Sequence, residues 1–146
     1  MHGLPSEKAA VVATVDPQTV ANTEKLSDAV DMQKWGEILA ILLTGDMASE
    51  TIDFKLMECA TSGGTYTDIT GKAITQRAAH ASNNDNLQFV VNLKAEELGA
   101  GKRYVKARAI TGGATGGPAS VVILGLRPKF APASDDDLAS VAEIIA

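Results

Sequence analysis

The sequence predicts an all-β protein, an antiparallel β-sandwich, on three observations. Residues 52–56 and 87–93 alternate apolar and polar side chains, the period that places one face of a strand on a core and the other in water. Glycine and other turn residues separate these segments from their neighbours. With 146 residues the chain is long enough for one domain, so we expect a single core, strand-rich over residues 37–126.

Three parts are expected along the chain: an extended N-terminal arm over residues 1–23, the sandwich over 24–130 and a C-terminal tail over 131–146. The arm mixes Gly, Pro, Ser and Thr around the apolar stretch 9–15. Two interpretations stay open for it, since an extended arm can pair as an edge strand or reach onto a neighbouring subunit.

Residues 18–43 fit more than one kind of element. A helix would place Val20 and Leu26 on one stripe, whereas the apolar run 38–43 suits a strand. Gly36 interrupts the segment and therefore favours strands.

From residue 50 onward the pattern is clearer. Ile52, Phe54 and Leu56 form one face of a strand, and the glycine-containing loop 61–65 predicts a hairpin that returns antiparallel at 66–69. The elements expected after it are a strand over 87–93, one helical turn over 95–99, a strand over 104–110, a glycine-rich loop over 112–117 and a buried strand over 121–126.

The last residues predict a short amphipathic helix. Ser134 is a good N-cap, and Leu138, Val141 and Ile145 fall on one stripe of a helix that begins there. An isolated helix of this length is marginal in water, so it needs a partner surface.

Composition limits the classes of partner that we expect. Aromatic residues make up 4% of the chain, which argues against clefts that stack sugars or bases, and the net charge of −5 argues against binding along nucleic acid. The cluster Lys102, Arg103, Lys106 and Arg108 is interpreted as a solvated face. No signal-peptide stretch occurs in residues 1–14, and the longest apolar run is far too short to cross a membrane.

The residues that carry chemistry elsewhere do not form a site in this sequence. His2 and His80 lie far apart and lack acidic or cysteine neighbours at metal-ligand spacing, so we expect no metal and no cofactor. The single Cys59 forms no internal disulfide and is interpreted as a half-buried structural thiol in a reduced setting. Acidic residues 135–137 suit the start of a helix better than a cation site. We therefore expect no enzyme.

Apolar residues in the two terminal parts, with the one tryptophan, are the candidates for a protein interface. Trp35 fits either an interface anchor or the core. The candidate interface residues are Val11, Val12, Val15, Trp35, Phe130, Leu138, Val141, Ile144 and Ile145.

Several blocks in a fixed order resemble a family of small structural proteins encoded near the major capsid protein of tailed bacteriophages. The likeness spans residues 28–132, and its blocks are 31–35, 43–47 with 51–56, 69–76, 96–98 and 103–107. It implies a jelly-roll-like sandwich that serves as a cement or decoration protein, binds the major capsid protein on the outer surface of the virion, commonly as homotrimers, and is made in the host cytoplasm. It also supports strands over 29–43.

Two other function classes are weighed against this one. A ligand- or carbohydrate-binding sandwich, or a tail-associated structural protein, would have the same architecture. An enzyme ranks last because no nucleophile stands beside a base. Neither nucleic acid nor membrane is an expected partner.

Overall fold

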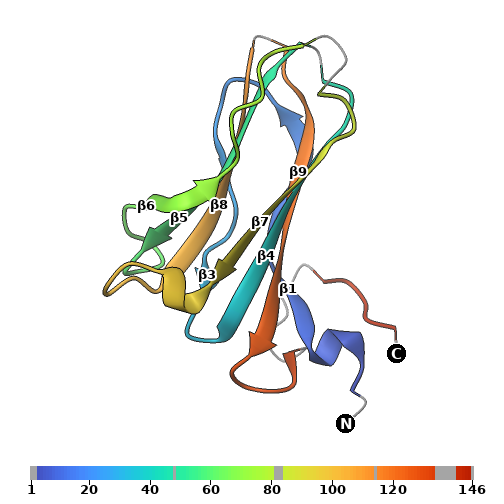
Figure 1. Cartoon of the computed structure of the whole chain (residues 1–146). Helices are drawn as coiled ribbons and strands as arrows, with labels where there is room; N and C mark the ends of the chain where they lie inside the picture. The colour runs from blue at the N-terminus through green and yellow to red at the C-terminus, as the bar shows by residue number, and fades with distance from the viewer. Residues whose placement is uncertain (1–2, 48, 81–83, 114, 134–140, 146) are drawn as a thin grey trace.

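Two antiparallel sheets pack face to face in the computed structural model, which describes residues 3–47, 49–80, 84–113, 115–133 and 141–145 (Figure 1). One sheet has four strands, in the order β1 (Ala9–Val20), β9 (Gly117–Pro128), β4 (Trp35–Thr44) and β7 (Gln88–Lys94). The other has five: β2 (Lys25–Leu26), β8 (Tyr104–Gly112), β5 (Thr51–Cys59) and β6 (Thr67–Ala73) in order, with β3 (Val30–Asp31) also paired to β8. The predicted antiparallel sandwich is confirmed.

Successive strands of the chain mostly belong to opposite sheets. The chain passes from one sheet to the other after β1, β3, β4, β6, β7 and β8. Each sheet is therefore built from segments that are distant in sequence. Two short 3₁₀ turns, η1 (Pro5–Glu7) and η2 (Ala95–Glu97), complete the described elements, and η2 is the helical turn expected after β7.

Large and small side chains alternate across the inner faces. Phe54 lies opposite Ala109 in the β5–β8 pair, and Leu56 lies opposite Ala107. All four are buried. A large side chain on one strand thus lies beside a small one on the neighbouring strand, an alternation that lets facing sheets interdigitate.

The N-terminal arm is largely an edge strand. Residues 9–20 pair antiparallel with β9, with irregularities at Val12 and between Val15 and Gln18. Of the two interpretations left open by the sequence, pairing within the chain's own sheet is the one found. The extended arm is reduced to the residues before Ala9, because pairing with β9 satisfies the backbone and buries the apolar stretch.

The predicted C-terminal helix is not supported. Residues 134–140 lie outside the described residues, and residues 141–145 have no helical structure. The physical reason is the one that makes any short helix marginal: without a packed apolar face, its few hydrogen bonds do not offset the cost of nucleation. The tail nevertheless starts from a fixed point, since Ala133 is fully buried in the core.

Trp35 belongs to the core and lies over a glycine. Only 2% of its surface is exposed, and a Cβ built on Gly125 would lie 2.4 Å from Trp35 Cδ2. Because Gly125 has no side chain, the indole ring of Trp35 can pack directly against its backbone.

Replacing that glycine should therefore destabilise the sandwich. We expect Gly125→Ala to lower the free energy of unfolding by about 2 kcal/mol, the usual cost of overpacking a core, as measured by chemical denaturation. Gly63→Ala is the matched control, because a Cβ at residue 63 meets nothing within 4 Å. Equal stability of the two variants would contradict the packing of Trp35 on Gly125.

Candidate functional site

Three of the predicted interface residues are part of the protein's own core. Val12, Val15 and Trp35 are all buried, and Val15 lies opposite Val121 on the inner face of the four-stranded sheet. These three residues are therefore not candidate contacts for a partner, because a buried side chain cannot touch another protein. Their apolar character reflects packing between the sheets.

The other candidates keep exposed surface where the structure describes them. Phe130 is 69% exposed, Ile144 46% and Ile145 85%, while Val141 is half-buried. Leu138 lies outside the described residues. We call residues 129–146, the chain after β9, the C-terminal segment.

Val11 lies on a different surface, the outer face of the four-stranded sheet, where it is half-buried opposite Leu124. This outer face is apolar over most of its width. We call it the apolar face, and its members are Val11 of β1, Leu39, Ile41 and Leu43 of β4, Val90 of β7, and Val122, Leu124 and Leu126 of β9. Sequence reasoning had found only Val11, because strand patterns alone did not show which face of β4 and β9 would be covered.

The outer face of the five-stranded sheet is polar by contrast. Lys55 pairs with Asp68 at 2.6 Å, Arg108 pairs with Glu24 at 2.6 Å, and the Lys106 ammonium lies 5.1 Å from the centre of the Tyr66 ring. These contacts involve two members of the basic cluster that the sequence shows, Lys106 and Arg108. Both cations are held by neighbouring side chains rather than arranged along a groove for phosphates.

The strongest of these ion pairs joins β3 to the start of β8. Arg103 Nε donates to Asp31 Oδ1 at 2.8 Å and Arg103 Nη2 donates to Asp31 Oδ2 at 2.6 Å. The two-pronged hydrogen bond with Arg103 lowers the pKa of Asp31 below its ordinary value, since it stabilises the charged carboxylate. Tyr104 lies beneath the same guanidinium, 5.0 Å from ring centre to Arg103 Cζ.

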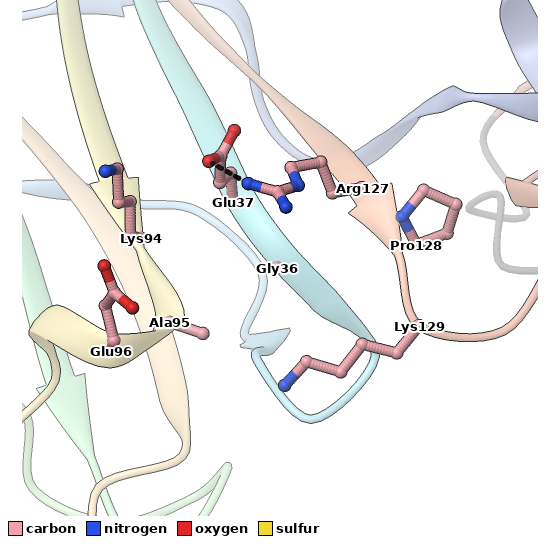
Figure 2. A pocket seen from close by; sticks show the side chains of 8 residues that line it. All are labelled: Gly36, Glu37, Lys94, Ala95, Glu96, Arg127, Pro128 and Lys129. Atoms are coloured by element: carbon pink, nitrogen blue, oxygen red, sulfur yellow. Dashed lines mark hydrogen bonds and ion pairs between the residues drawn. The ribbon is translucent and has the colours of Figure 1, made fainter.

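A hollow of about 720 Å³ opens at the end of the four-stranded sheet where β4 begins and β7 and β9 end (Figure 2). Lys94, Arg127 and Lys129 line it together with Glu37 and Glu96, and Arg127 Nη1 donates to Glu37 Oε1 at 3.1 Å. None of the described residues that line this hollow has an aromatic ring. Its mixed charges and open shape do not resemble the apolar, enclosed pockets that hold small ligands.

A buried polar cluster at the opposite end of the sandwich was not found from the sequence. Glu50 is buried, and its Oε1 accepts a hydrogen bond from the Gly116 backbone N–H at 2.9 Å. Asn84 Nδ2 donates to the Glu50 carbonyl oxygen at 2.8 Å and to the Ala78 carbonyl oxygen at 2.9 Å. Among the described residues Glu50 Oε2 has no hydrogen-bond partner. The cluster ties three loops to one another, which is a structural role.

Groups suited to chemistry are scattered in the described part of the chain. No three His, Cys, Asp or Glu side chains gather there as metal ligands, and His2 lies outside it. Cys59 is a free, buried thiol at the end of β5. Among the helices that the structure describes, none has the length and apolar character needed to span a bilayer.

Comparison with known proteins gives no match to any protein-family model or curated protein. Among solved structures, a Bacillus endospore appendage protein that forms disulfide-linked pili has a TM-score of 0.44 at 13% identity, covering 86% of this chain and 96% of its own. The K1 and K3 cleaved adhesin domains of Lys-gingipain from Porphyromonas gingivalis W83 have TM-scores of 0.40 and 0.36 at 16% and 18% identity. Coverage is 73% and 69% of this chain, which spans 63% and 60% of those two. Likenesses this distant establish neither a family nor a function.

The Asp31–Arg103 pair predicts a defined loss of stability in acid. Because the folded pKa of Asp31 is lowered, its contribution is fully present above the ordinary value of 3.8 and is lost as pH falls through the lowered pKa. We expect Asp31→Asn to reduce the free energy of unfolding at neutral pH, and the gap to the unmodified chain to close as the pH drops below 3.8. Urea titrations at a series of pH values measure this gap.

Asp68→Asn provides the control, since it removes a more exposed ion pair, with Asp68 60% exposed. Such pairs contribute little to stability, so this variant should follow the unmodified chain at every pH. A gap for Asp31→Asn that stays constant into strong acid would contradict the assignment.

Proposed function

We propose that this chain is a non-enzymatic structural protein that attaches to a larger protein assembly through its C-terminal segment. Following the resemblance of its sequence blocks, we propose that the assembly is the shell of a tailed bacteriophage head. The chain would bind the major capsid protein on the outer surface, as cement or decoration. Three large apolar side chains exposed on one terminal segment are the observation that carries the proposal.

Those three residues are unusual for their position rather than for their type. Single exposed apolar residues are common on protein surfaces. Phe130, Ile144 and Ile145, however, all lie after β9 among described residues that belong to neither sheet, and two of them are more than two-thirds exposed. Water contact with such side chains is unfavourable and is relieved when they insert into a partner surface.

The start of the C-terminal segment is fixed to the sandwich, as a segment that bridges to a partner requires. Lys129 Nζ donates to the Met32 carbonyl oxygen at 3.1 Å, and Ala133 is buried in the core. Residues 142–145 are exposed and lie in neither sheet, so they can add contact area without enlarging the core, which is how a small protein can bridge weakly held neighbours. Both sheets are complete without this segment.

Charge also supports an external position. The net charge of −5 disfavours close approach to packed DNA, so an acidic protein suits the outside of a filled shell better than the inside. The homotrimer that the resemblance implies stays a prediction.

The two aromatic residues best suited to a carbohydrate-binding role are not exposed enough to stack on a sugar. Sugar recognition generally uses exposed aromatic faces, whereas Trp35 is buried and Tyr104 lies half-buried beneath Arg103. A position on the tail differs from a position on the head mainly in the number of copies per particle.

Removing residues 134–146 should abolish capsid attachment while leaving the sandwich folded, since Ala133 remains in place. Cosedimentation with capsid shells that lack the protein measures binding, and saturation gives the copy number, high for a shell and small for a tail. The double variant Ile144→Ser, Ile145→Ser should weaken binding about tenfold or more.

Leu26→Ser is the matched control, because Leu26 is 42% exposed but lies on β2. Unchanged binding by the truncated chain would overturn attachment through the C-terminal segment. Deleting residues 1–16 is no such test, since it would remove most of β1.

A further inference from the structure

We propose that the apolar face of the four-stranded sheet is a self-association surface. A second copy of the chain packs its own apolar face against it, related by a two-fold axis that runs across the strands. This inference differs from the homotrimer that the resemblance implies, and the oligomeric state of the purified chain distinguishes the two. It is separate from capsid binding, because Phe130, Ile144 and Ile145 are not members of the apolar face.

The apolar face is continuous across all four strands. Strand register places outward residues in rows, and the central row runs Thr14, Val122, Ile41, Val90. The next row toward the start of β4 runs Val11, Leu124, Leu39, Asn92. Leu43 and Leu126 extend the patch in the two directions. Leu43 is 41% exposed and Val90 is 52% exposed, so the patch reaches solvent.

Both central strands have the sequence of strands that are buried on two faces. Residues 38–43 of β4 and 121–126 of β9 contain no polar residue. Uninterrupted apolar runs of this kind are typical of strands covered on both sides, whereas a strand with one wet face alternates. The sandwich covers only their inner faces. The outer face of the other sheet, with its ion pairs, shows how this chain builds a face that stays in water.

The size of the face suits a second sheet. At the standard strand spacing and rise, four strands over the ten residues of β4 span about 19 by 32 Å, or about 600 Å². Two such faces bury about 1,200 Å² together, which reaches the lower limit of specific protein interfaces. The apolar centre with polar edges also matches the usual anatomy of an interface. A second copy is the partner whose face has this same shape and size. Two sheets that pack face to face lie about 10 Å apart.

Charge selects the orientation of the second copy. Lys94, Arg127 and Lys129 lie at the end where β4 begins, with Glu37 held by Arg127 and Glu96 nearby. Asp46 and Asp85 lie at the opposite end, where β4 ends and β7 begins, and Asp46 is exposed.

A two-fold axis through the Ile41 row places Glu37 and its strand neighbour Lys94 of one copy opposite Gly45 and Asn86 of the other, since residues 37 and 45 each lie four residues from Ile41. Glu37 is paired with Arg127, so Lys94 is the cation that faces Asp46, whose Oδ1 accepts a hydrogen bond from Asn86 Nδ2 at 3.0 Å. An axis along the strands would instead bring the two cationic ends together, which is unfavourable.

Sedimentation velocity over a range of concentrations, on the purified full-length chain, tests the pairing. We expect a monomer–dimer equilibrium, and Leu43→Lys should raise its dissociation constant about tenfold to a hundredfold, because each substitution counts twice in a two-fold interface. Leu26→Lys is the matched control at 42% exposure on the other sheet, and it should leave the equilibrium unchanged. Circular dichroism and unfolding curves verify that both variants fold.

A charge swap tests the orientation. Lys94→Glu should weaken the dimer, and adding Asp46→Lys to the same chain should restore it, since the swap re-forms an opposite-charge contact. A wild-type monomer at all concentrations, equal effects of Leu43→Lys and Leu26→Lys, or a trimer in place of a dimer would overturn the proposal. Failure of Asp46→Lys to restore the dimer that Lys94→Glu weakens would overturn the two-fold orientation.

Discussion

The pairing of β9 with β1 on one side and β4 on the other is the constraint on which the rest of the structure depends. β9 is hydrogen-bonded along nearly its whole length to both neighbours, so it joins residues 9–20 to residues 35–44 within one sheet (Figure 1). Gly125 of this strand has no side chain, and the Trp35 ring occupies the space where one would lie. The same strand ends beside the point where the C-terminal segment leaves the sandwich. Core, edge and tail are therefore all positioned by one strand.

The two sheets have opposite outer characters, and this difference organises the surface. One face is covered by ion pairs and cation–aromatic contacts, whereas the other is covered by aliphatic side chains. The inner faces of both supply the core. The sandwich is in this sense a rigid scaffold that presents an apolar sheet face and an apolar terminal segment. Neither feature requires a catalytic group, and both are consistent with the proposed structural role.

Individual residues show where sequence patterns were sufficient and where they were not. Alternation in Ile52, Phe54 and Leu56 predicted a strand and its buried face together, because a period of two leaves one solution. Val12 and Val15 were assigned to an interface because an apolar stretch in a terminal arm looks the same whether its own chain or a partner covers it. The predicted C-terminal helix is not supported by the described part of the tail, residues 141–145, because amphipathic spacing describes what a helix would bury, while its stability depends on a surface that the pattern does not contain.

The sequence by itself determined that the chain forms an antiparallel sandwich, since alternation and turn residues act over a few neighbouring positions. Only the tertiary structure decided that residues 9–20 close the four-stranded sheet, and that Glu50 is buried beneath the glycine loop. Those outcomes depend on which distant segments become neighbours. For the runs 38–43 and 121–126 the two sources combine: the sequence shows strands apolar on both faces, and the fold shows that only one of those faces is covered within the chain.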